Sequence, residues 1–283
     1  MKWNFKPELV CLFGQPVAEN PTQHMIEAAF RHHGLDWRYV TMEVAPEQLE
    51  AAVAGMRAMG FRGGNCTIPH KVAVQKYLDR IGESASLIGA VNCIVRQDDL
   101  LVGENTDGKG FLQSLRDLQE PRGRRVMMFG AGGAARAIAV ELALAGVEHI
   151  QIWNRSEARG RELVDLLHQR TDVAADFHSW QQDAPIDASV DVLVNATSIG
   201  LFPQVDERIP LIEKDLRENL IVADVIPNPP QTRLIREARS RGCQVLDGLG
   251  MLVNQGVLGF RYWTGVDPDP AIMRAALEEV FGT

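Results

Sequence analysis

The feature that most constrains the fold of this 283-residue chain is a glycine-rich turn between a strand pattern and a helix pattern. Residues 124–129 have the apolar character of a buried strand, and the Ala/Leu-rich stretch up to Ala145 predicts a helix. This order is typical of a dinucleotide-binding Rossmann unit, and a tight turn without a ligand is the alternative. The spacing is G-x-G-x-x-A, and the predicted pyrophosphate site comprises Gly130, Ala131, Gly132, Gly133 and Ala134.

The end of the next strand pattern favours NADP over NAD. An NAD site normally has an Asp or Glu here, which binds the ribose 2′-hydroxyl. This chain has Asn154 at that position, followed by Arg155 and Ser156, and Arg159 lies one helical turn further on. Two guanidinium groups can hold a 2′-phosphate with charge-assisted hydrogen bonds, so the sequence predicts NADP as the cofactor. The alternative is that both arginines are solvated charges at the start of a helix.

Strand and helix patterns alternate along the whole chain, which predicts α/β units with mainly parallel sheets covered on both faces. Proline-rich segments mark the loops between the later strands. Strands are predicted at 9–14, 39–44, 63–68, 89–95, 100–104, 149–153, 190–197, 220–225 and 243–247, and helices at 22–31, 46–59, 71–77, 109–118, 251–263 and 270–281.

Three polar residues near the predicted strand ends are candidates for chemistry, because open α/β sheets bind ligands beyond the carboxyl ends of their strands. Lys71 is either a working lysine or a surface lysine at a helix start, where the helix dipole disfavours a cation by ~0.3–1 kcal/mol. Asp107 is either a catalytic carboxylate or a helix cap. Asn92 interrupts an apolar run, so its amide is either paired in the core or directed at a ligand.

Composition excludes several functional classes. The net charge of −8 without a basic block argues against a nucleic-acid partner. No run approaches the ~20 apolar residues of a membrane span, and the first residues lack the features of a secretory signal, so we expect a cytoplasmic location. The four cysteines lie far apart without metal-binding spacing, so no metal site is predicted.

Several separate motifs, in the correct order, are similar to those of the shikimate dehydrogenase family. The resemblance extends nearly from one end of the chain to the other, and its motifs are specific. The matching segments are 63–71 (G-x-N-V-T-x-P-x-K, with Cys66 for the valine), 89–92 (G-A-V-N), 105–108 (N-T-D-G), 130–136 (G-A-G-G-A-x-R), 154–156 (N-R-T), 195–200 (N-A-T-S-x-G) and 248–255 (G-L-G-M-L-x-x-Q).

The resemblance implies an NADP-dependent alcohol dehydrogenase that interconverts shikimate, or a close cyclic hydroxy acid, and 3-dehydroshikimate. This is a reaction of the chorismate pathway of aromatic amino acid biosynthesis. It also implies a substrate domain at 1–106, a Rossmann domain at 107–243, C-terminal helices at 244–283 that return to the substrate domain, and a monomer or homodimer. In this family Lys71 and Asp107 would be the catalytic pair. The further implied contacts are Thr67, Asn92 and Gln255 with the substrate ring, and Thr197 and Gly248 with the cofactor.

The departures from the family are concentrated at the residues that bind the substrate carboxylate. Asn20 and Thr22 stand at the two serines of S-x-S-P, Gln23 stands at its proline, and Pro227 stands at a tyrosine. Loss of one good hydrogen bond to a buried carboxylate costs ~1.5–3 kcal/mol. We therefore expect Asn20 and Thr22 to serve either a weak shikimate dehydrogenase or a paralogue with another substrate, such as quinate or aminoshikimate. A nucleotide-binding protein with little catalysis is a further alternative, and quinate oxidation with NAD conflicts with Arg155.

Overall fold

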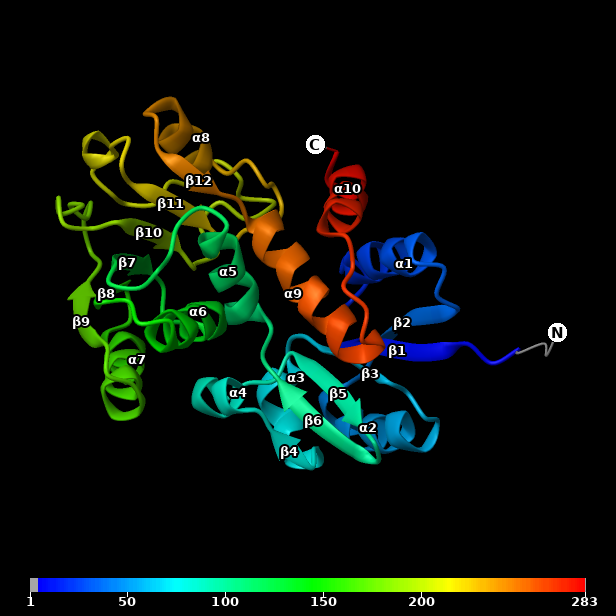
Figure 1. Cartoon of the computed structure of the whole chain (residues 1–283). Coiled ribbons are helices and arrows are strands. Elements are labelled where there is room, and N and C mark those ends of the chain that lie inside the picture. Colours follow the sequence, from blue (N-terminus) through cyan, green and yellow to red (C-terminus); the bar gives the residue numbers. More distant parts are fainter. Residues whose placement is uncertain (1–4, 283) are drawn as a thin grey trace. The chain divides into compact units, whose positions relative to one another are not determined.

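The computed structural model of the protein describes residues 5–282 and divides into two compact units. The first unit contains the chain up to Thr106 and again from Val253, and the second unit runs from Asp107 to Leu252. Each unit has its own six-stranded sheet with helices packed on it (Figure 1). The predicted α/β fold is therefore confirmed. Within the described residues, no helix has the length and apolar character needed to cross a membrane.

The sheet of the first unit has the order β2-β1-β3-β5-β6-β4 and is rich in parallel pairs, as predicted. β1 pairs in parallel with β2 and β3, whereas β5 runs antiparallel to both β3 and β6. β5 and β6 form a hairpin whose turn contains Asp98 at φ 55°. The strands are β1 (Glu8–Gly14), β2 (Trp37–Glu43), β3 (Gly63–Cys66), β4 (Arg80–Ile81), β5 (Cys93–Gln97) and β6 (Leu100–Glu104).

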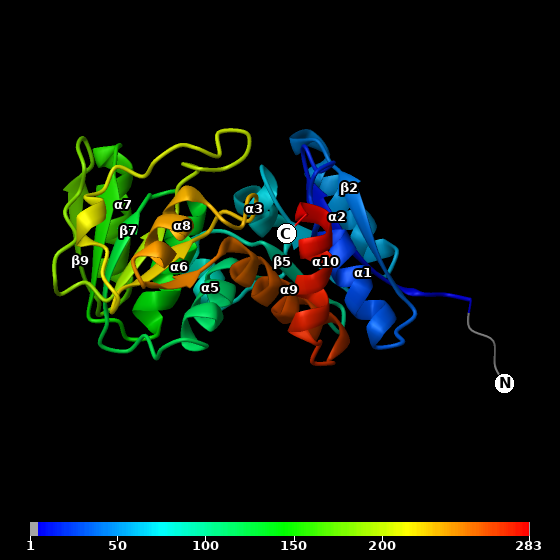
Figure 2. The same ribbon diagram turned by 90° about the horizontal axis from the view of Figure 1, so that it is seen from above.

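Helices cover both faces of this sheet. On one face α1 packs beside α10 and the later part of α9 (Figures 1 and 2), and the rings of Phe30 and Phe260 lie 5.2 Å apart. On the other face Val53 and Met56 of α2 join the strand residues Cys11 and Ile94 in one buried cluster. The helices are α1 (Thr22–His32), α2 (Leu49–Ala58), α3 (His70–Ala73), α4 (Glu83–Ile88), α9 (Gly248–Thr264) and α10 (Pro270–Phe281), with 3-10 turns η1 (Pro46–Gln48) and η2 (Val74–Tyr77).

The sheet of the second unit is parallel throughout, with the order β12-β11-β10-β7-β8-β9. α5, α6 and α7 form a connected layer (Figure 1). α8 and the segments before and after β10 enclose a core around Met127, Phe129 and Leu193. The elements are β7 (Arg125–Phe129), β8 (His149–Asn154), β9 (Ala174–Ser179), β10 (Val192–Asn195), β11 (Ile221–Asp224), β12 (Gln244–Leu246), α5 (Asp107–Arg116), α6 (Gly133–Leu144), α7 (Glu157–Arg170), α8 (Arg233–Ser240) and η3 (Glu213–Asp215).

Strand order reverses in this unit beside β7, because the chain proceeds to β8 and β9 on one side and then to β10, β11 and β12 on the other. Such a reversal leaves a crevice beyond the carboxyl ends of the central strands, where dinucleotides bind. The glycine turn after β7 lies at this crevice. The fold thus places the predicted nucleotide turn where ligand binding is expected.

Two predicted elements change in character as well as in their limits. The strand predicted at 89–95 is observed at Cys93–Gln97, because Gly89 has φ 72° and forms the left-handed C-cap of α4, which is not a strand conformation. The helix predicted at 71–77 is a short α-turn, α3, followed by the 3-10 turn η2.

The C-terminal division of the chain falls at Leu252/Val253, inside α9, rather than at the predicted 243/244. The first turn of α9 stays with the second unit for a steric reason. An added Cβ on Gly248 would meet the Ile226 carbonyl oxygen at 2.2 Å, and one on Gly250 would meet the Ser114 hydroxyl at 3.2 Å. These close approaches fix the start of the helix on the Rossmann unit.

Candidate active site

Lys71 lies on α3, just beyond the carboxyl end of β3, and is half-buried. Its carbonyl oxygen accepts a hydrogen bond from the Val91 N–H at 2.7 Å, which ties α3 to the segment before β5. The neighbouring His70 is buried, and its Nε2 lies 2.7 Å from the Val44 carbonyl oxygen, so His70 anchors the helix. Burial raises the pKa of the Cys66 thiol to about 12, and the charge of Lys71 opposes that rise. The lysine charge therefore lies close to the end of β3.

Thr67 lies between β3 and α3, and its backbone N–H donates to the Phe13 carbonyl oxygen at 2.9 Å. Gly14 ends β1, and an added Cβ there would meet the Thr67 Cγ2 atom at 2.3 Å. Only glycine leaves room for the threonine, because any larger residue would displace it. The ends of β1 and β3 thus place Thr67 and Lys71 in one region of the first unit.

Asn92, Thr106 and Gln255 form a buried polar cluster in the first unit. The Asn92 amide nitrogen donates to the Thr106 hydroxyl at 3.0 Å, and its oxygen accepts from the Thr106 N–H at 2.7 Å. The Thr106 hydroxyl also lies 3.5 Å from the Gln255 side-chain oxygen. Asp107, the residue after Thr106, opens α5. The Asn92 amide is thus paired with Thr106, whose hydroxyl also links it to Gln255.

Thr106 is a member of this candidate cluster that the sequence motifs did not single out. The available signal was its position inside the Asn105–Gly108 motif, next to the aspartate that drew attention. Its side chain joins two predicted substrate residues that are far apart in the sequence. A residue of this kind is found only when the fold is known, because its role depends on a helix that arrives more than a hundred residues later.

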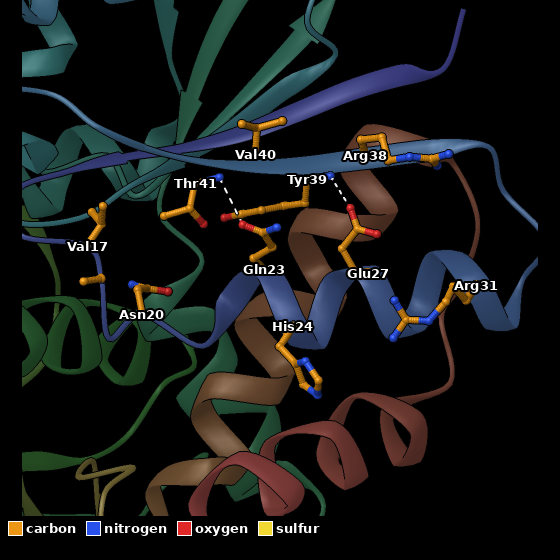
Figure 3. A pocket seen from close by; sticks show the side chains of 11 residues that line it. Val17, Asn20, Gln23, His24, Glu27, Arg31, Arg38, Tyr39, Val40 and Thr41 are labelled. Atoms are coloured by element: carbon orange, nitrogen blue, oxygen red, sulfur yellow. Dashed lines mark hydrogen bonds between the residues drawn. The ribbon is translucent and has the colours of Figure 1, made fainter. Parts of the chain in front are cut away.

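Three of the four residues that depart from the family lie around the start of α1, namely Asn20 in the loop after β1 and Thr22 and Gln23 in the first turn of the helix. Asn20 Oδ1 accepts the Thr22 N–H at 3.0 Å in an Asx-type turn just before α1, and Thr22 itself is buried. The Gln23 side chain points towards the edge strand β2, where its oxygen accepts the Thr41 N–H at 3.2 Å. Glu27 does the same for the Tyr39 N–H at 2.7 Å (Figure 3). Gln23 therefore seals a sheet edge.

A pocket of about 910 Å³ lies along this edge, between α1 and β2 (Figure 3). Asn20 is at one end of it, and Arg31 and Arg38 line it further along the helix and strand. The Lys71 and Thr67 side chains are not among the residues that line it. We therefore assign the chemistry to the strand ends and not to this groove.

The glycine turn of the second unit has the shape that a pyrophosphate requires. Gly130 has φ 109°, and an added Cβ would meet the Ala196 carbonyl oxygen at 2.7 Å. At Gly132 and Gly133 an added Cβ would meet nothing within 4 Å, so the backbone at the start of α6 is open. Free N–H groups at a helix start attract an anion. Ala131 and Ala134 are half-buried beside this open backbone.

The end of β8 carries the predicted 2′-phosphate residues on its exposed side. The Asn154 amide donates to the Ser156 carbonyl oxygen at 2.8 Å, and the Ser156 hydroxyl caps α7 by accepting the Arg159 N–H at 3.5 Å. Arg155 and Arg159 are both exposed. Two exposed guanidinium groups beside an ordered turn fit a phosphate monoester, so the residues present suit NADP.

Thr197 and Gly248 are both fixed in place, Thr197 by hydrogen bonds and Gly248 by a close backbone contact. The Thr197 hydroxyl donates to Asn195 Oδ1 at 2.7 Å and accepts the Ile199 N–H at 3.1 Å. Gly248 packs on the Ile226 carbonyl oxygen, as described above. No group of three or more His, Cys, Asp or Glu side chains within residues 5–282 is arranged to hold a metal ion.

Comparison with known protein families decides which family has this arrangement. The Shikimate dehydrogenase substrate binding domain matches residues 12–94, Shikimate / quinate 5-dehydrogenase matches 113–229, and the Shikimate 5′-dehydrogenase C-terminal domain matches 248–278. The chain belongs to the shikimate dehydrogenase family. A relative from Geobacter metallireducens, named shikimate dehydrogenase (NADP(+)), is 44% identical over 275 residues, which are 95% of each chain.

Solved structures agree with this assignment. The ligand-free 5-ketofructose reductase of Gluconobacter sp. strain CHM43 is 48% identical, with a TM-score of 0.96 over 98% of this chain and 100% of that one. The shikimate 5-dehydrogenase of Thermus thermophilus, solved with NADP(H) and shikimate, is 33% identical, with a TM-score of 0.83 over 96% and 99% of the two chains.

The family membership confirms the predictions of an enzyme, of an oxidoreductase and of NADP as its cofactor. This chain is an NADP-dependent oxidoreductase of the shikimate dehydrogenase type, and its substrate is a small molecule. The roles of the individual site residues are predictions.

Proposed function

We propose that the enzyme interconverts a ring secondary alcohol and the corresponding ketone, with shikimate, or a close cyclic hydroxy acid, and 3-dehydroshikimate as the leading pair. The observation that supports this best is the buried cluster of Asn92, Thr106 and Gln255. Thr106 directly precedes Asp107 in the chain. Amide and hydroxyl groups both donate and accept hydrogen bonds, so they suit a ring with several hydroxyls. Thr67 belongs to the same proposed substrate set.

In the proposed reaction, NADP supplies the acceptor for the hydride that leaves the alcohol carbon. Lys71 takes the hydroxyl proton as a general base, so the alcohol loses a proton and a hydride and becomes a ketone. In the reverse direction its ammonium protonates the developing alkoxide. Asp107 would orient Lys71 and stabilise the ammonium form.

The proposed cofactor site combines the open backbone at the start of α6 with the end of β8. Gly132 and Gly133 leave space for the pyrophosphate, and Gly130 makes the bend. Arg155 and Arg159 would bind the 2′-phosphate, and their exposure leaves both guanidinium groups accessible to it. Asn154 and Ser156 shape the turn that presents them.

An uncharged keto sugar is a second candidate substrate, and a specific observation favours it. Asn20, Thr22 and Pro227 stand at positions where the family has groups that bind a carboxylate. The 48% identical relative is named for 5-ketofructose, a keto sugar with no carboxylate. The same Lys71 chemistry would serve both substrates.

The decisive experiment compares substrates and variants under the same conditions. NADPH oxidation is measured with 3-dehydroshikimate and with 5-ketofructose, and NADP reduction is measured with shikimate and with quinate. We expect Lys71→Ala to lower kcat by ~10²–10⁴-fold on the preferred substrate, because it removes the proton-transfer group. The dissociation constant for NADPH should stay unchanged in this variant.

Lys76→Ala is the matched control, since Lys76 is an exposed lysine one turn further along, on η2. It should leave kcat unchanged. A higher kcat/KM for the shikimate pair would support the leading function, and a higher value for 5-ketofructose would support the second. Binding of NADPH without turnover of any of these compounds would contradict both.

We further propose that the enzyme works in the cytoplasm as a monomer or homodimer and needs no nucleic-acid or membrane partner. The net charge of −8 is consistent with this. Sedimentation velocity at micromolar and submicromolar concentrations would distinguish the two oligomeric states.

A further inference from the structure

Asp224, the last residue of β11, is a buried carboxylate, with 2% of its surface exposed. Its hydrogen-bond partners are an amide, a hydroxyl and backbone N–H groups, none of which carries a charge. Burial raises the pKa of Asp224 to about 6, so the carboxylate is ionised at neutral pH. A buried charge paired only with neutral donors is costly, and the hydrogen bonds of this one hold two loops in place.

The first loop held by Asp224 follows β10. The Asn195 amide nitrogen donates to Asp224 Oδ1 at 3.0 Å, and its oxygen accepts the Thr197 hydroxyl at 2.7 Å. The Thr197 hydroxyl in turn accepts the Ile199 N–H at 3.1 Å. The same loop presents the Ala196 carbonyl oxygen to Gly130 in the nucleotide turn.

The second loop follows β11 itself. The Ile226 N–H donates to Asp224 Oδ1 at 3.1 Å, and the Ile226 carbonyl oxygen lies where Gly248 must have no side chain. Asp224 Oδ2 accepts the Thr232 hydroxyl at 2.8 Å, and this hydroxyl caps α8. Asp224 therefore fixes two loops, and each of them touches a predicted cofactor-binding glycine.

The strand order indicates which half of the dinucleotide these loops serve. The glycine turn follows β7, and the arginines for the 2′-phosphate follow β8, so the adenosine half belongs to the β7–β8 side. β10 and β11 lie on the opposite side of the strand-order reversal. In a doubly wound sheet that side holds the second mononucleotide, which in NADP contains the nicotinamide.

We propose that Asp224 is a positioning residue for the nicotinamide half of NADP, because its buried carboxylate fixes the Asn195–Gly200 loop and the Ile226–Pro230 loop by hydrogen bonds. This inference rests on the proposed cofactor site. Asp224 would act through Asn195, Ile226 and Thr232, since its hydrogen bonds go to these residues and not to the glycine turn or the arginines.

The competing explanation is that Asp224 only stabilises the fold. A loss of stability would weaken every ligand of the second unit to a similar degree. A positioning role instead weakens only ligands that reach the loops after β10 and β11. The two explanations are separated by comparing NADPH with adenosine 2′,5′-bisphosphate, which occupies only the adenosine half.

The test measures the dissociation constants of both ligands for the wild-type enzyme, Asp224→Ala and Asp224→Asn by calorimetry. We expect Asp224→Ala to bind NADPH at least tenfold more weakly and the bisphosphate within twofold of wild type. Asp224→Asn keeps an oxygen for the Asn195 amide and the Ile226 N–H, so it should recover NADPH binding to within about threefold. Equal weakening of both ligands, an unchanged NADPH affinity in Asp224→Ala, or no recovery in Asp224→Asn would each overturn the proposal.

Asp191→Ala is the matched control. Asp191 accepts the Arg125 N–H at 2.9 Å at the amino ends of the strands of the same sheet, away from the loops that Asp224 holds. It should weaken neither ligand selectively. If Asp224→Ala does not fold, Asn195→Ala tests the same link from the loop side and should show the same selective loss. A wild-type enzyme that binds no NADPH would contradict the proposed cofactor site, whereas equal binding by wild type and Asp224→Ala would contradict this inference alone.

Discussion

The two units differ in the groups that they offer to a ligand beyond the carboxyl ends of their strands, which we call the carboxyl edge of each sheet. At the edge of the second unit the nucleotide turn is made of backbone, because Gly132 and Gly133 expose N–H groups and leave space around them. At the edge of the first unit the candidate contacts are side chains, namely Asn20, Thr22 and the buried amide cluster. The second unit also carries a buried charge, Asp224, whereas the cluster of Asn92, Thr106 and Gln255 contains only neutral groups.

This difference explains where the sequence can change. A site made of backbone requires glycine at fixed positions, since a side chain there would block the ligand or strain the turn. A site made of side chains can exchange one hydrogen-bonding residue for another without altering the fold. The glycine turn accordingly matches the family motif, and two of the three departures, Asn20 and Thr22, lie in the first unit.

The largest expected effect separates the two functions of glycine in the turn. Gly132→Ala should weaken NADPH binding by about 100-fold, roughly 3 kcal/mol, because its Cβ would occupy the space for the pyrophosphate. Its melting temperature should not change, since that Cβ meets nothing within 4 Å. Gly130→Ala should lower both, because φ is 109° and the Cβ would meet the Ala196 oxygen at 2.7 Å. Calorimetric titration and thermal melts check this, and unchanged affinity in Gly132→Ala would mean that the open backbone is not the phosphate site.

The next effect concerns the buried charge of Asp224 in the second unit. Burial raises the pKa of Asp224 from 3.8 to about 6, so between pH 4 and 6 the folded state binds more protons than the unfolded state. Stability contributed by this group is therefore present at low pH and is lost as pH rises through about 6, by roughly 2–3 kcal/mol. The neutral cluster of Asn92, Thr106 and Gln255 in the first unit should show no such loss.

Asp224→Asn removes this titration, and urea denaturation at pH 4.5 and 7.5 measures it. Relative to wild type, the variant should be more stable at pH 7.5 than at pH 4.5, which means that the difference in the free energy of unfolding, variant minus wild type, is larger at pH 7.5. The comparison between the two pH values cancels any constant cost of the substitution, such as an unpaired Thr232 hydroxyl. Parallel pH profiles for both proteins would show that the carboxylate is not perturbed.

The parts predicted from sequence are those whose chemistry acts through local patterns. The glycine turn, the helix after it and the strand ends at Lys71 and Asp107 were all predicted, because each depends on a short run of residues. β9 and α8 were not predicted. β9 is a short edge strand in which only Ala175 is buried, and α8 carries three arginines among its apolar residues. Both elements depend on the neighbouring strands for their packing.

Contacts between distant segments could not be predicted. Thr106 meets Gln255 only because α9 returns to the first unit, and Gln23 meets Thr41 only because α1 lies along β2. Asp224 looked like an ordinary strand end, and its partners Asn195 and Thr232 lie in separate segments. Sequence patterns specify elements, whereas these hydrogen bonds depend on how the elements are assembled.

The smallest expected effect tests the side-chain edge directly. Asn20→Ser restores a hydroxyl of the family motif, and this hydroxyl can still accept the Thr22 N–H as the asparagine oxygen does. We expect kcat/KM for the shikimate pair to rise about threefold to tenfold relative to that for 5-ketofructose, since one hydrogen bond is worth about 0.5–1.5 kcal/mol. Steady-state kinetics with both substrates measure this ratio.

Gln23→Ala is the matched control for that experiment, because Gln23 belongs to the same departure from the family but faces the sheet edge. It should lower stability by about 0.5–1.5 kcal/mol and leave the substrate ratio unchanged, as it removes only the partner of the Thr41 N–H. A ratio that moves in Gln23→Ala but not in Asn20→Ser would place substrate recognition in the groove between α1 and β2. The comparison of the two sheet edges would then fail, because the substrate would bind beside an edge strand rather than beyond the strand ends.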